Sequence, residues 1–301
     1  MTQSLVLGGN GYLGTELVNQ LASLGHPIVS VDLEIPLAQL KSVEYLAVDI
    51  SDEEQLATLF DHCHFDRVFH FAGIASLNDA SEDFAKTIRM NSLVTLDILK
   101  HMHNRGIGRL VYASSMYVFS ETGGTYRLSK QISEQIIEEF CRNYPVASSI
   151  IRFGSIYGPG SNDSNGLHEI IKHALMKETI KYEGDPESMR EYIHVRDAIR
   201  ACVEIANSDA LQSNVYLVTG DRFMRVYDVL LMIKEMLGNK KLVEFENRHD
   251  SGHYVTTPYT YKPTAAVKYQ LKNVLDFSHG LWELIHYVAN SENSKISKGD
   301  L

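Results

Sequence analysis

The sequence predicts an α/β protein built on a doubly wound parallel sheet. In the first half of the 301-residue chain, short β-branched runs alternate with helical patterns of period 3.6, which is typical of repeated βαβ units. The expected strands are residues 5–7, 28–31, 44–48, 67–71, 109–112 and 147–151. The expected helices between them are residues 12–24, 53–61, 82–103 and 126–141.

The pattern becomes less regular after the Gly-Pro-Gly sequence at residues 158–160. Helices are expected at residues 167–176 and 196–206, and strands at 192–195 and 215–218. We therefore expect a first domain over residues 1–157, to which residues 192–218 contribute. A smaller C-terminal α/β domain should occupy residues 158–290, and a polar, mobile tail residues 291–301.

Net charge limits the kinds of partner to expect, and cysteine content indicates the compartment. A net charge of −10 without a cluster of Lys and Arg disfavours nucleic acid and anionic membranes, so a small molecule is the expected partner. Cys63, Cys141 and Cys202 are widely spaced and form no CxxC pair, and no signal-like apolar run is present. We expect a reducing compartment, the cytoplasm. His62 and His64 flank Cys63, but adjacent ligands without a second cluster rarely close a tetrahedral site, so no metal is expected.

Glycines follow the first strand and open the first helix, at Gly8, Gly11 and Gly14. Such a turn permits a tight bend, lets backbone N–H groups approach a pyrophosphate, and lets helix and strand pack closely. Asp32 ends the second strand about where an acid binds the ribose hydroxyls of a dinucleotide, and Glu34 adds negative charge. The sequence therefore predicts a Rossmann-type domain that prefers NAD to NADP. A glycine-rich turn without a ligand remains the alternative.

Two later strand ends extend this expected site. Asp49 and Ile50 follow the third strand, where the carboxylate suits an adenine amino group. Phe71, Ala72 and Gly73 follow the fourth, where small residues let backbone pass close to a ligand. Ordinary strand-end sequence is the alternative for either one.

A tyrosine and a lysine stand four residues apart, at Tyr126 and Lys130, and therefore on one face of a helix. A phenol with an ordinary pKa near 10 can serve as a base near neutral pH only if a nearby cation favours the phenolate. Ser115 ends the fifth strand, where its hydroxyl can hydrogen-bond the reacting oxygen of a substrate. An exposed amphipathic helix can carry the same Tyr-Lys spacing. The position of this pair after the fifth strand is what favours a catalytic role.

Five separated segments together resemble the extended short-chain dehydrogenase/reductases, the NAD-dependent epimerase/dehydratase family that acts on nucleotide sugars. They are residues 8–14, 32, 113–118, 126–130 and the pair 151–160 and 189–197. The resemblance spans about residues 4–205. It implies that residues 1–157 form the NAD-binding domain and that residues 158–290 mainly bind substrate.

The resemblance also implies residue roles. Tyr126 would exchange a proton with a sugar hydroxyl, usually at C4, while hydride passes to the nicotinamide. Lys130 would bind the nicotinamide ribose and lower the pKa of Tyr126, and Ser115 would steady the carbinol oxygen. The implied cofactor contacts are Gly8, Gly11, Tyr12, Leu13, Gly14, Asp32, Asp49, Ile50, Phe71, Ala72, Gly73, Asn91, Tyr126, Lys130 and Phe153. The implied substrate contacts are Met116, Ser155 and Arg190, with Arg190 at the diphosphate.

Three features depart from the family pattern. Only residues 116–125 separate Ser115 from Tyr126, so the pocket is open or is closed by another segment or a second subunit. Met116 and Tyr117 stand where the family's 4,6-dehydratases carry an acidic pair, which excludes dehydration. Ser155 replaces a common Asn. The aromatic segment 252–263 is either a packed loop or a source of sugar contacts.

A nucleotide-sugar 4-epimerase is the leading hypothesis for function. A net dehydrogenase or keto-sugar reductase would need the same three catalytic residues, and a noncatalytic NAD(H)-binding sensor could share the fold. Helices 82–103 and 126–141 resemble those through which family members pair, so a homodimer is expected. Four apolar residues support this pairing: Ile88, Leu93, Leu96 and Leu99.

Overall fold

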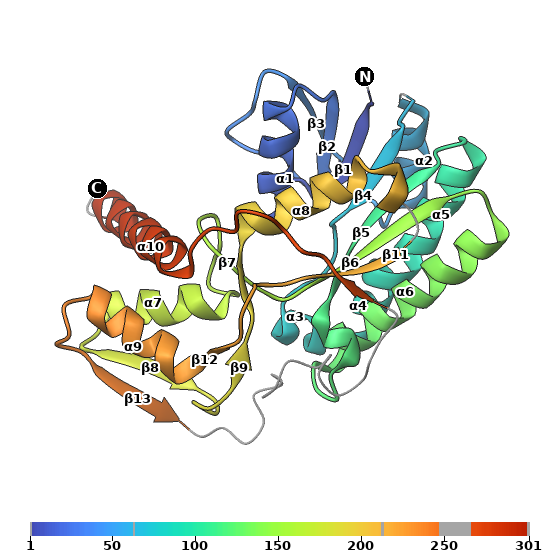
Figure 1. The fold of residues 1–301 in the computed structure, drawn as a ribbon. Helices are drawn as coiled ribbons and strands as arrows, with labels where there is room; N and C mark the ends of the chain where they lie inside the picture. Colours follow the sequence, from blue (N-terminus) through green and yellow to red (C-terminus); the bar gives the residue numbers. More distant parts are fainter. Residues whose placement is uncertain (1, 63, 212–213, 247–265, 300–301) are drawn as a thin grey trace. The chain divides into compact units, whose positions relative to one another are not determined.

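The computed structural model describes residues 2–62, 64–211, 214–246 and 266–299 (Figure 1). The chain divides into two compact units, each with its own core. The first contains the residues up to Phe153, Ile199–Leu217 and the short strand at residues 267–268. The second contains residues 154–198, the segment that begins at Val218 and the chain after Gln270. The helix Val195–Ala206 therefore begins in one unit and ends in the other.

An eight-stranded sheet forms the first unit and confirms the predicted fold class. Its order is β14-β11-β6-β5-β4-β1-β2-β3, and the pairs between β3 and β6 are all parallel. The strands are β1 Ser4–Leu7, β2 Ile28–Asp32, β3 Val43–Ala47, β4 Arg67–His70, β5 Arg109–Ser115, β6 Ala147–Phe153, β11 Asn214–Val218 and β14 Val267–Lys268. Strands β5 and β6 extend beyond their expected ends, which brings Ser115 and Phe153 into register at the carboxyl edge.

Three helices of this unit match their predicted positions: α1 Tyr12–Ser23, α2 Glu53–His62 and α6 Gly124–Asn143. The prediction of a single helix over residues 82–103 is wrong. The chain forms α3 Leu77–Glu82, α4 Phe84–Ile88, a π-helical turn Arg89–Leu93 and α5 Val94–Asn104. Asp83 is extended and caps α4 by accepting a hydrogen bond from Lys86 N at 2.9 Å, which explains the break.

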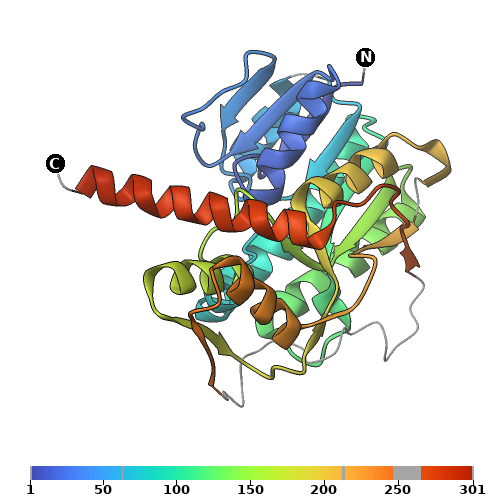
Figure 2. The same ribbon diagram turned by 60° about the vertical axis from the view of Figure 1, so that its left-hand side comes forward.

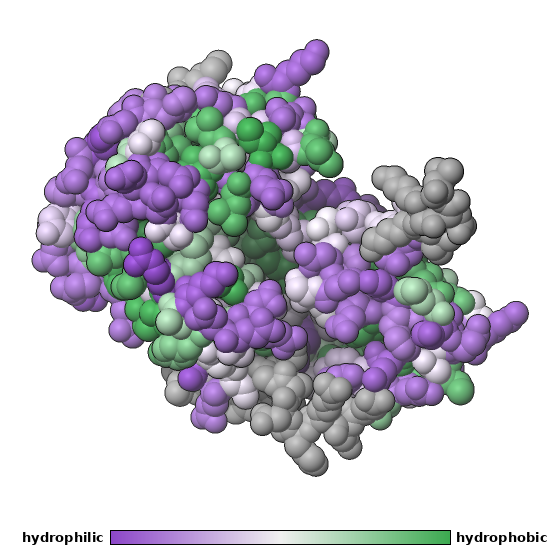
Figure 3. Space-filling model, turned by 180° about the vertical axis from the view of Figure 1, so that it is seen from behind, coloured by the Kyte–Doolittle hydropathy of each residue, from purple (hydrophilic) through white to green (hydrophobic). Residues whose placement is uncertain are grey.

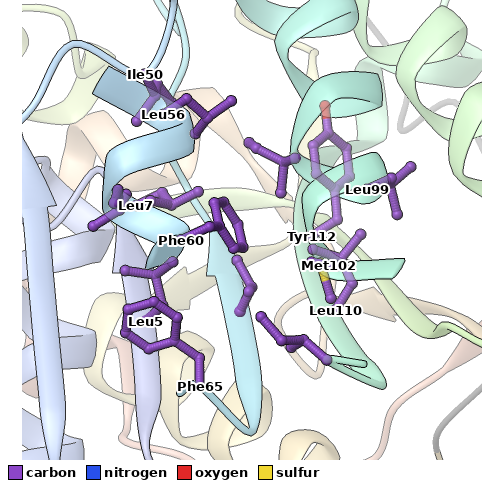
Figure 4. Packing of buried hydrophobic residues seen from close by; sticks show 14 of the residues in the cluster. Leu5, Leu7, Ile50, Leu56, Phe60, Phe65, Leu99, Met102, Leu110 and Tyr112 are labelled. Atoms are coloured by element: carbon purple, nitrogen blue, oxygen red, sulfur yellow. The ribbon is translucent and has the colours of Figure 1, made fainter. Parts of the chain in front are cut away.

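The core of the first unit lies between the sheet and helices α2, α5 and α6, while α1 lies on the opposite face (Figure 1). Figure 4 shows side chains from strands and helices pointing toward one another, among them Leu7 of β1, Phe60 of α2 and Leu99 of α5. Because helices cover both faces, the central strands β1 and β4 are buried at every residue rather than at alternate residues.

Helices and three two-stranded sheets make up the second unit. The helices are α7 Gly166–Met176, α9 Val226–Met236 and α10 Phe277–Gly299, together with the start of α8 Val195–Ala206. The strand pairs are β7 Ser155–Tyr157 with β10 Tyr192–His194, β8 Thr179–Glu183 with β13 Leu242–Glu246, and β9 Met189–Arg190 with β12 Met224–Arg225. Figure 2 shows α10 alongside α7 and α9, where Ile171, Ile233 and Leu284 are buried.

Helix α10 runs to Gly299 and so includes most of the segment 291–301, whose expected mobility stays a prediction. The hydroxyl of Ser291 donates to Tyr287 O at 2.9 Å and that of Ser294 to Asn290 O at 2.8 Å. These polar side chains bond within the helix, so a polar composition did not end it.

No helix among the described residues is long and apolar enough to cross a membrane. On the face that Figure 3 shows, hydrophilic residues predominate and hydrophobic ones are interspersed among them.

Leu99 and Leu93 give a matched test of this packing. Leu99 is fully buried in the core, whereas Leu93 is 46% exposed in the π-helical turn. Leu99→Ala should lower the free energy of unfolding by about 2–5 kcal/mol, because it leaves a cavity. Leu93→Ala should change it by less than about 0.5 kcal/mol. Urea unfolding of dilute protein measures both, and equal losses would contradict the packing described.

Candidate functional site

The glycine-rich turn between β1 and α1 is closed too tightly for side chains. Gly8 has φ +87°, its N–H donates to Val31 O at 2.8 Å, and a Cβ on it would lie 2.5 Å from Ala72 N. A Cβ on Gly14 would overlap the carbonyl oxygen of Gly8. Gly11 is the N-cap of α1, whose first turn contains no acidic residue. The first turn of the helix therefore carries no carboxylate of its own at its positive end, which suits a diphosphate.

Asp32 lies at the end of β2, beside this turn. Its Oδ2 accepts a hydrogen bond from Asn10 N at 2.9 Å, and its Oδ1 accepts one from Leu33 N at 2.8 Å. The Asn10 side chain donates to Glu34 O. Two backbone donors thus fix the orientation of the carboxylate, and each oxygen keeps lone-pair capacity for a ribose hydroxyl.

The next strand end holds Asp49 and Ile50. The Asp49 Oδ1 accepts hydrogen bonds from Ser51 N at 2.9 Å and Ser51 Oγ at 2.7 Å, which forms a turn before α2. Ile50 is a member of the hydrophobic core. A cofactor contact from Ile50 would therefore come from its backbone, and the expected adenine contact of Asp49 stays a prediction.

Asn91 lies buried in the π-helical turn and joins three segments. Its Oδ1 accepts from Ile74 N at 2.8 Å, and its Nδ2 donates to Ile74 O at 3.0 Å and to Ser129 Oγ at 2.9 Å. A Cβ on Gly73, whose φ is +152°, would lie 2.8 Å from the Asn91 Oδ1. Both N–H groups of the amide are thus used within the protein, which indicates that Asn91 holds the loop after β4 against α6.

The structure brings Ser115, Tyr126 and Lys130 together at the carboxyl end of β5. Ser115 lies beside the Tyr126 phenol and favours its ionised form. Lys130 Nζ donates to Ala113 O at 2.8 Å and to Tyr112 OH at 3.3 Å, and it lies 5.9 Å from the centre of the Tyr126 ring. The three residues that were predicted to be catalytic therefore form one cluster.

Burial dominates the ionisation of this cluster. It raises the pKa of the Tyr126 phenol, and Ser115 opposes that rise. It lowers the pKa of Lys130 to about 8, against the attraction of Glu134. The expectation that Lys130 lowers the pKa of Tyr126 in the complete site stays a prediction, since burial has the largest effect on this phenol. A second cation beside the ring would be needed to favour the phenolate.

A buried polar network that sequence reasoning missed continues this cluster. Arg152 Nε donates to Glu134 Oε1 at 2.9 Å, and the hydroxyl of Ser114 donates to the same carboxylate. His70 Nε2 lies 3.1 Å from Thr95 Oγ1, and burial next to Lys130 lowers the pKa of His70 to about 3. The four-residue spacing from Lys130 to Glu134 was the available sequence signal.

The short segment between Ser115 and Tyr126 is compact. It begins with a 3₁₀ turn, Met116–Phe119, in which Met116 is buried. Gln131 Nε2 donates to Val118 O at 2.6 Å and Arg127 Nη1 to Ser120 O at 3.1 Å, so α6 holds the segment at two points. The Tyr117 ring packs edge-on against that of Tyr126, with centroids 6.1 Å apart. A substrate contact from Met116 stays a prediction.

Ser155 and Arg190 belong to the second unit. Ser155 N donates to Glu191 O at 3.3 Å, beside the β7–β10 pair. Arg190 is 9% exposed, and its Nη1 donates to Met189 O at 3.0 Å. Their expected substrate contacts stay predictions, and the segment 252–263 lies outside the described residues.

The histidines next to Cys63 have protein partners. His62 Nε2 lies 2.8 Å from Glu44 Oε1, and His64 Nε2 lies 3.9 Å from Asp66 Oδ1. Cys63 lies outside the described residues. Within the part of the chain that the structure describes, no group of three or more histidine, cysteine or acidic residues could hold a metal ion.

Known proteins resemble this chain over most of its length. The chain is 22% identical to the UDP-glucuronate 4-epimerase of Thermodesulfobacterium geofontis, over 93% of this chain and 97% of that protein. It is 27% identical to the UDP-glucose 4-epimerase of Yersinia enterocolitica, over 77% and 80%. The solved UDP-glucose 4-epimerase of Thermotoga maritima, 20% identical, superposes with a TM-score of 0.83 over 96% of this chain and 99% of that chain.

The family assignment rests on a match along most of the chain. The model of the NAD dependent epimerase/dehydratase family matches residues 4–219, which include the glycine-rich turn, the Ser115, Tyr126 and Lys130 cluster, and Arg190. The resemblance inferred from the separated motifs is therefore confirmed, and the chain belongs to the NAD-dependent epimerase/dehydratase family.

Proposed function

We propose that this protein is an NAD-dependent nucleotide-sugar 4-epimerase. The observation that carries the proposal is the meeting of Ser115, Tyr126 and Lys130 at the same sheet edge as the glycine-rich turn and Asp32. The family assignment supports an NAD-dependent enzyme, and the UDP-sugar 4-epimerases among its relatives support the reaction.

The chain supplies the parts that such a reaction needs. Tyr126 exchanges a proton with the C4 hydroxyl, and Ser115 hydrogen-bonds the same oxygen. Lys130 stays an ammonium near neutral pH, since its pKa is about 8. This ammonium is placed to bind the ribose next to the nicotinamide. Gly8, Gly14 and Asp32 would hold the dinucleotide. NAD bound there would supply the hydride acceptor and donor, and its oxidised ring would supply positive charge.

Two measurements test the reaction. Mass and absorbance spectra of any copurified nucleotide should show NAD or NADH. Incubation with UDP-, GDP-, dTDP- and CDP-sugars should then interconvert one pair of C4 epimers without net reduction of NAD. Stoichiometric accumulation of NADH or of a keto sugar would replace the epimerase with a dehydrogenase or reductase. Absence of turnover with tight NAD binding would favour a sensor.

Cofactor preference follows from the carboxylate at the end of β2. Asp32 can accept hydrogen bonds from the ribose hydroxyls and repels a 2′-phosphate. NAD should therefore bind at least about tenfold more tightly than NADP, a difference of about 1.4 kcal/mol in binding free energy. Asp32→Ala should narrow the difference. Titration of the cofactor-free protein with both dinucleotides measures it, and equal affinities in the parent protein would refute the assignment.

Tyr126 is expected to carry the proton. Tyr126→Phe keeps the ring that packs on Tyr117, so NAD should still bind, while turnover falls by a factor of about 10² to 10⁴. Ser115→Ala should cost less, because the tyrosine can still exchange the proton. Single-turnover reduction of bound NAD over a pH series is the measurement. A Tyr126→Phe protein with the parent rate and pH profile would exclude this role.

Assembly as a cytoplasmic homodimer through residues 82–103 and α6 completes the proposal. Leu99 is buried in the core and so cannot contact a second copy. Other apolar side chains in this stretch remain accessible: Leu93 is 46% exposed, Phe84 is 56% exposed, and Ile88 and Leu96 are partly buried. The free thiols of Cys141 and Cys202 fit a reducing compartment. Light scattering at micromolar concentration should give twice the chain mass of 33.9 kDa, and Leu93→Glu should lower it. A parent protein that is monomeric would contradict the dimer.

A further inference from the structure

The face of α6 that carries Tyr126 and Lys130 continues one turn further to Glu134. The three residues are spaced by four, so they lie along one side of the helix. Glu134 is only 6% exposed. Its carboxylate accepts hydrogen bonds from Arg152 Nε, at 2.9 Å and 3.2 Å to its two oxygens, from Arg152 Nη2 and from Ser114 Oγ. A charge this deeply buried is maintained only by such full pairing.

Three consecutive residues of β5 contact these three residues of α6. Ala113 O accepts from Lys130 Nζ at 2.8 Å, and Ser115 lies beside the Tyr126 phenol. Between them, Ser114 donates to Glu134.

Arg152 ties the same carboxylate to the neighbouring strand. It is the register partner of Ser114 on β6, so the carboxylate joins α6 to both strands at one level of the sheet. The guanidinium lies 4.0 Å from the centre of the Phe119 ring, which limits its movement. Glu134 therefore fixes the position of α6 along β5 and β6, at the level where Ser115, Tyr126 and Lys130 lie together.

The same carboxylate supplies the negative charge in this buried region. Three further titratable side chains surround Lys130, on β4, β5 and α6: His70, Tyr112 and Tyr126. Burial lowers the pKa of His70 to about 3 and raises the pKa of both phenols, so all three are neutral near pH 7. Burial also lowers the pKa of Lys130, and Glu134 opposes that change.

We infer that Glu134, held by Arg152 and Ser114, is a positioning residue for the reaction: it sets Lys130 and Tyr126 against β5 and keeps Lys130 an ammonium. The inference rests on the proposed function in one respect, that the charged form of Lys130 is the active one. The proton itself moves at Tyr126, and Glu134 touches neither substrate nor cofactor. Arg152 balances the carboxylate, so the network carries one net positive charge, which is that of Lys130.

Glu134→Gln is the test, because it keeps the shape of the side chain and removes its charge. The pKa of Lys130 should fall by about one pH unit, as expected for loss of an opposite charge one helical turn away. Lysine side-chain NMR of the NAD-free protein measures this pKa, with Lys130→Met assigning the signal. In turnover, the alkaline loss of kcat should move down equally, so that kcat at pH 8 falls about fivefold while KM stays within about twofold.

Two variants give controls of opposite kind. Arg67→Gln removes a buried guanidinium from β4 that bonds to Ser4 and Asn207, so it should leave the Lys130 pKa unchanged. Arg152→Gln keeps the carboxylate but removes its cation, so the Lys130 pKa should rise. Shifts of opposite sign from Glu134→Gln and Arg152→Gln are expected only if charge, rather than general destabilisation, acts on Lys130.

Several results would overturn the inference. A folded Glu134→Gln protein in which Lys130 titrates as in the parent protein would do so. A shifted Lys130 pKa with an unchanged pH profile would also do so, since the charge would not then matter to turnover. If Glu134→Gln does not fold, the rise expected for Arg152→Gln decides, and no rise refutes the role. If the parent protein epimerises no nucleotide sugar, the proposed function fails while the NMR titration still tests the electrostatic role.

Discussion

Desolvation of the polar face of α6 against β5 is the constraint on which the candidate site depends. Lys130 and Glu134 each expose 6% of their surface, and Arg152 exposes 7%. Charges this deeply buried cost several kcal/mol unless hydrogen bonds and opposite charges compensate them. The bonds from Lys130 to Ala113 O and from Arg152 to Glu134 supply that compensation, and they also fix where the helix lies. The interactions that make the burial tolerable are therefore those that place Tyr126 next to Ser115.

The cofactor half of the site depends on a different constraint, the absence of side chains. Gly8 and Gly14 leave no space for a Cβ, because the turn, the loop after β4 and the start of α1 meet there. Asp32 is held beside this turn by backbone N–H groups rather than by side chains. Backbone geometry therefore shapes the region proposed to bind the dinucleotide, whereas side-chain electrostatics shape the region proposed to be catalytic. The two meet at the carboxyl edge of one sheet, where parallel strands end together.

The π-helical turn shows how a local irregularity serves the site. A regular helix over residues 82–103 would have placed Asn91 differently relative to α6, whereas the turn lets its amide bond both Ile74 and Ser129. π-helical turns are rare and often found at functional sites. One extra residue moves the apolar pattern by about 100° around the helix, but a period averaged over the whole stretch does not show where that residue lies. The amide bonds of Asn91 could thus be seen only in three dimensions.

The sequence by itself determined the fold class and the family, and it pointed to Ser115, Tyr126 and Lys130 as the cluster proposed to transfer the proton. Glycine spacing, the Tyr126 and Lys130 spacing, and the alternation of strands and helices are local properties that backbone sterics and helix geometry fix. Tertiary structure decided which charged groups share the buried space and therefore which protonation states they adopt. Glu134 and Arg152 are 18 residues apart, and they meet only because α6 packs across β5 and β6. Desolvation depends on everything that surrounds a group, so the raised pKa of Tyr126 and the lowered pKa of Lys130 follow from packing rather than from spacing.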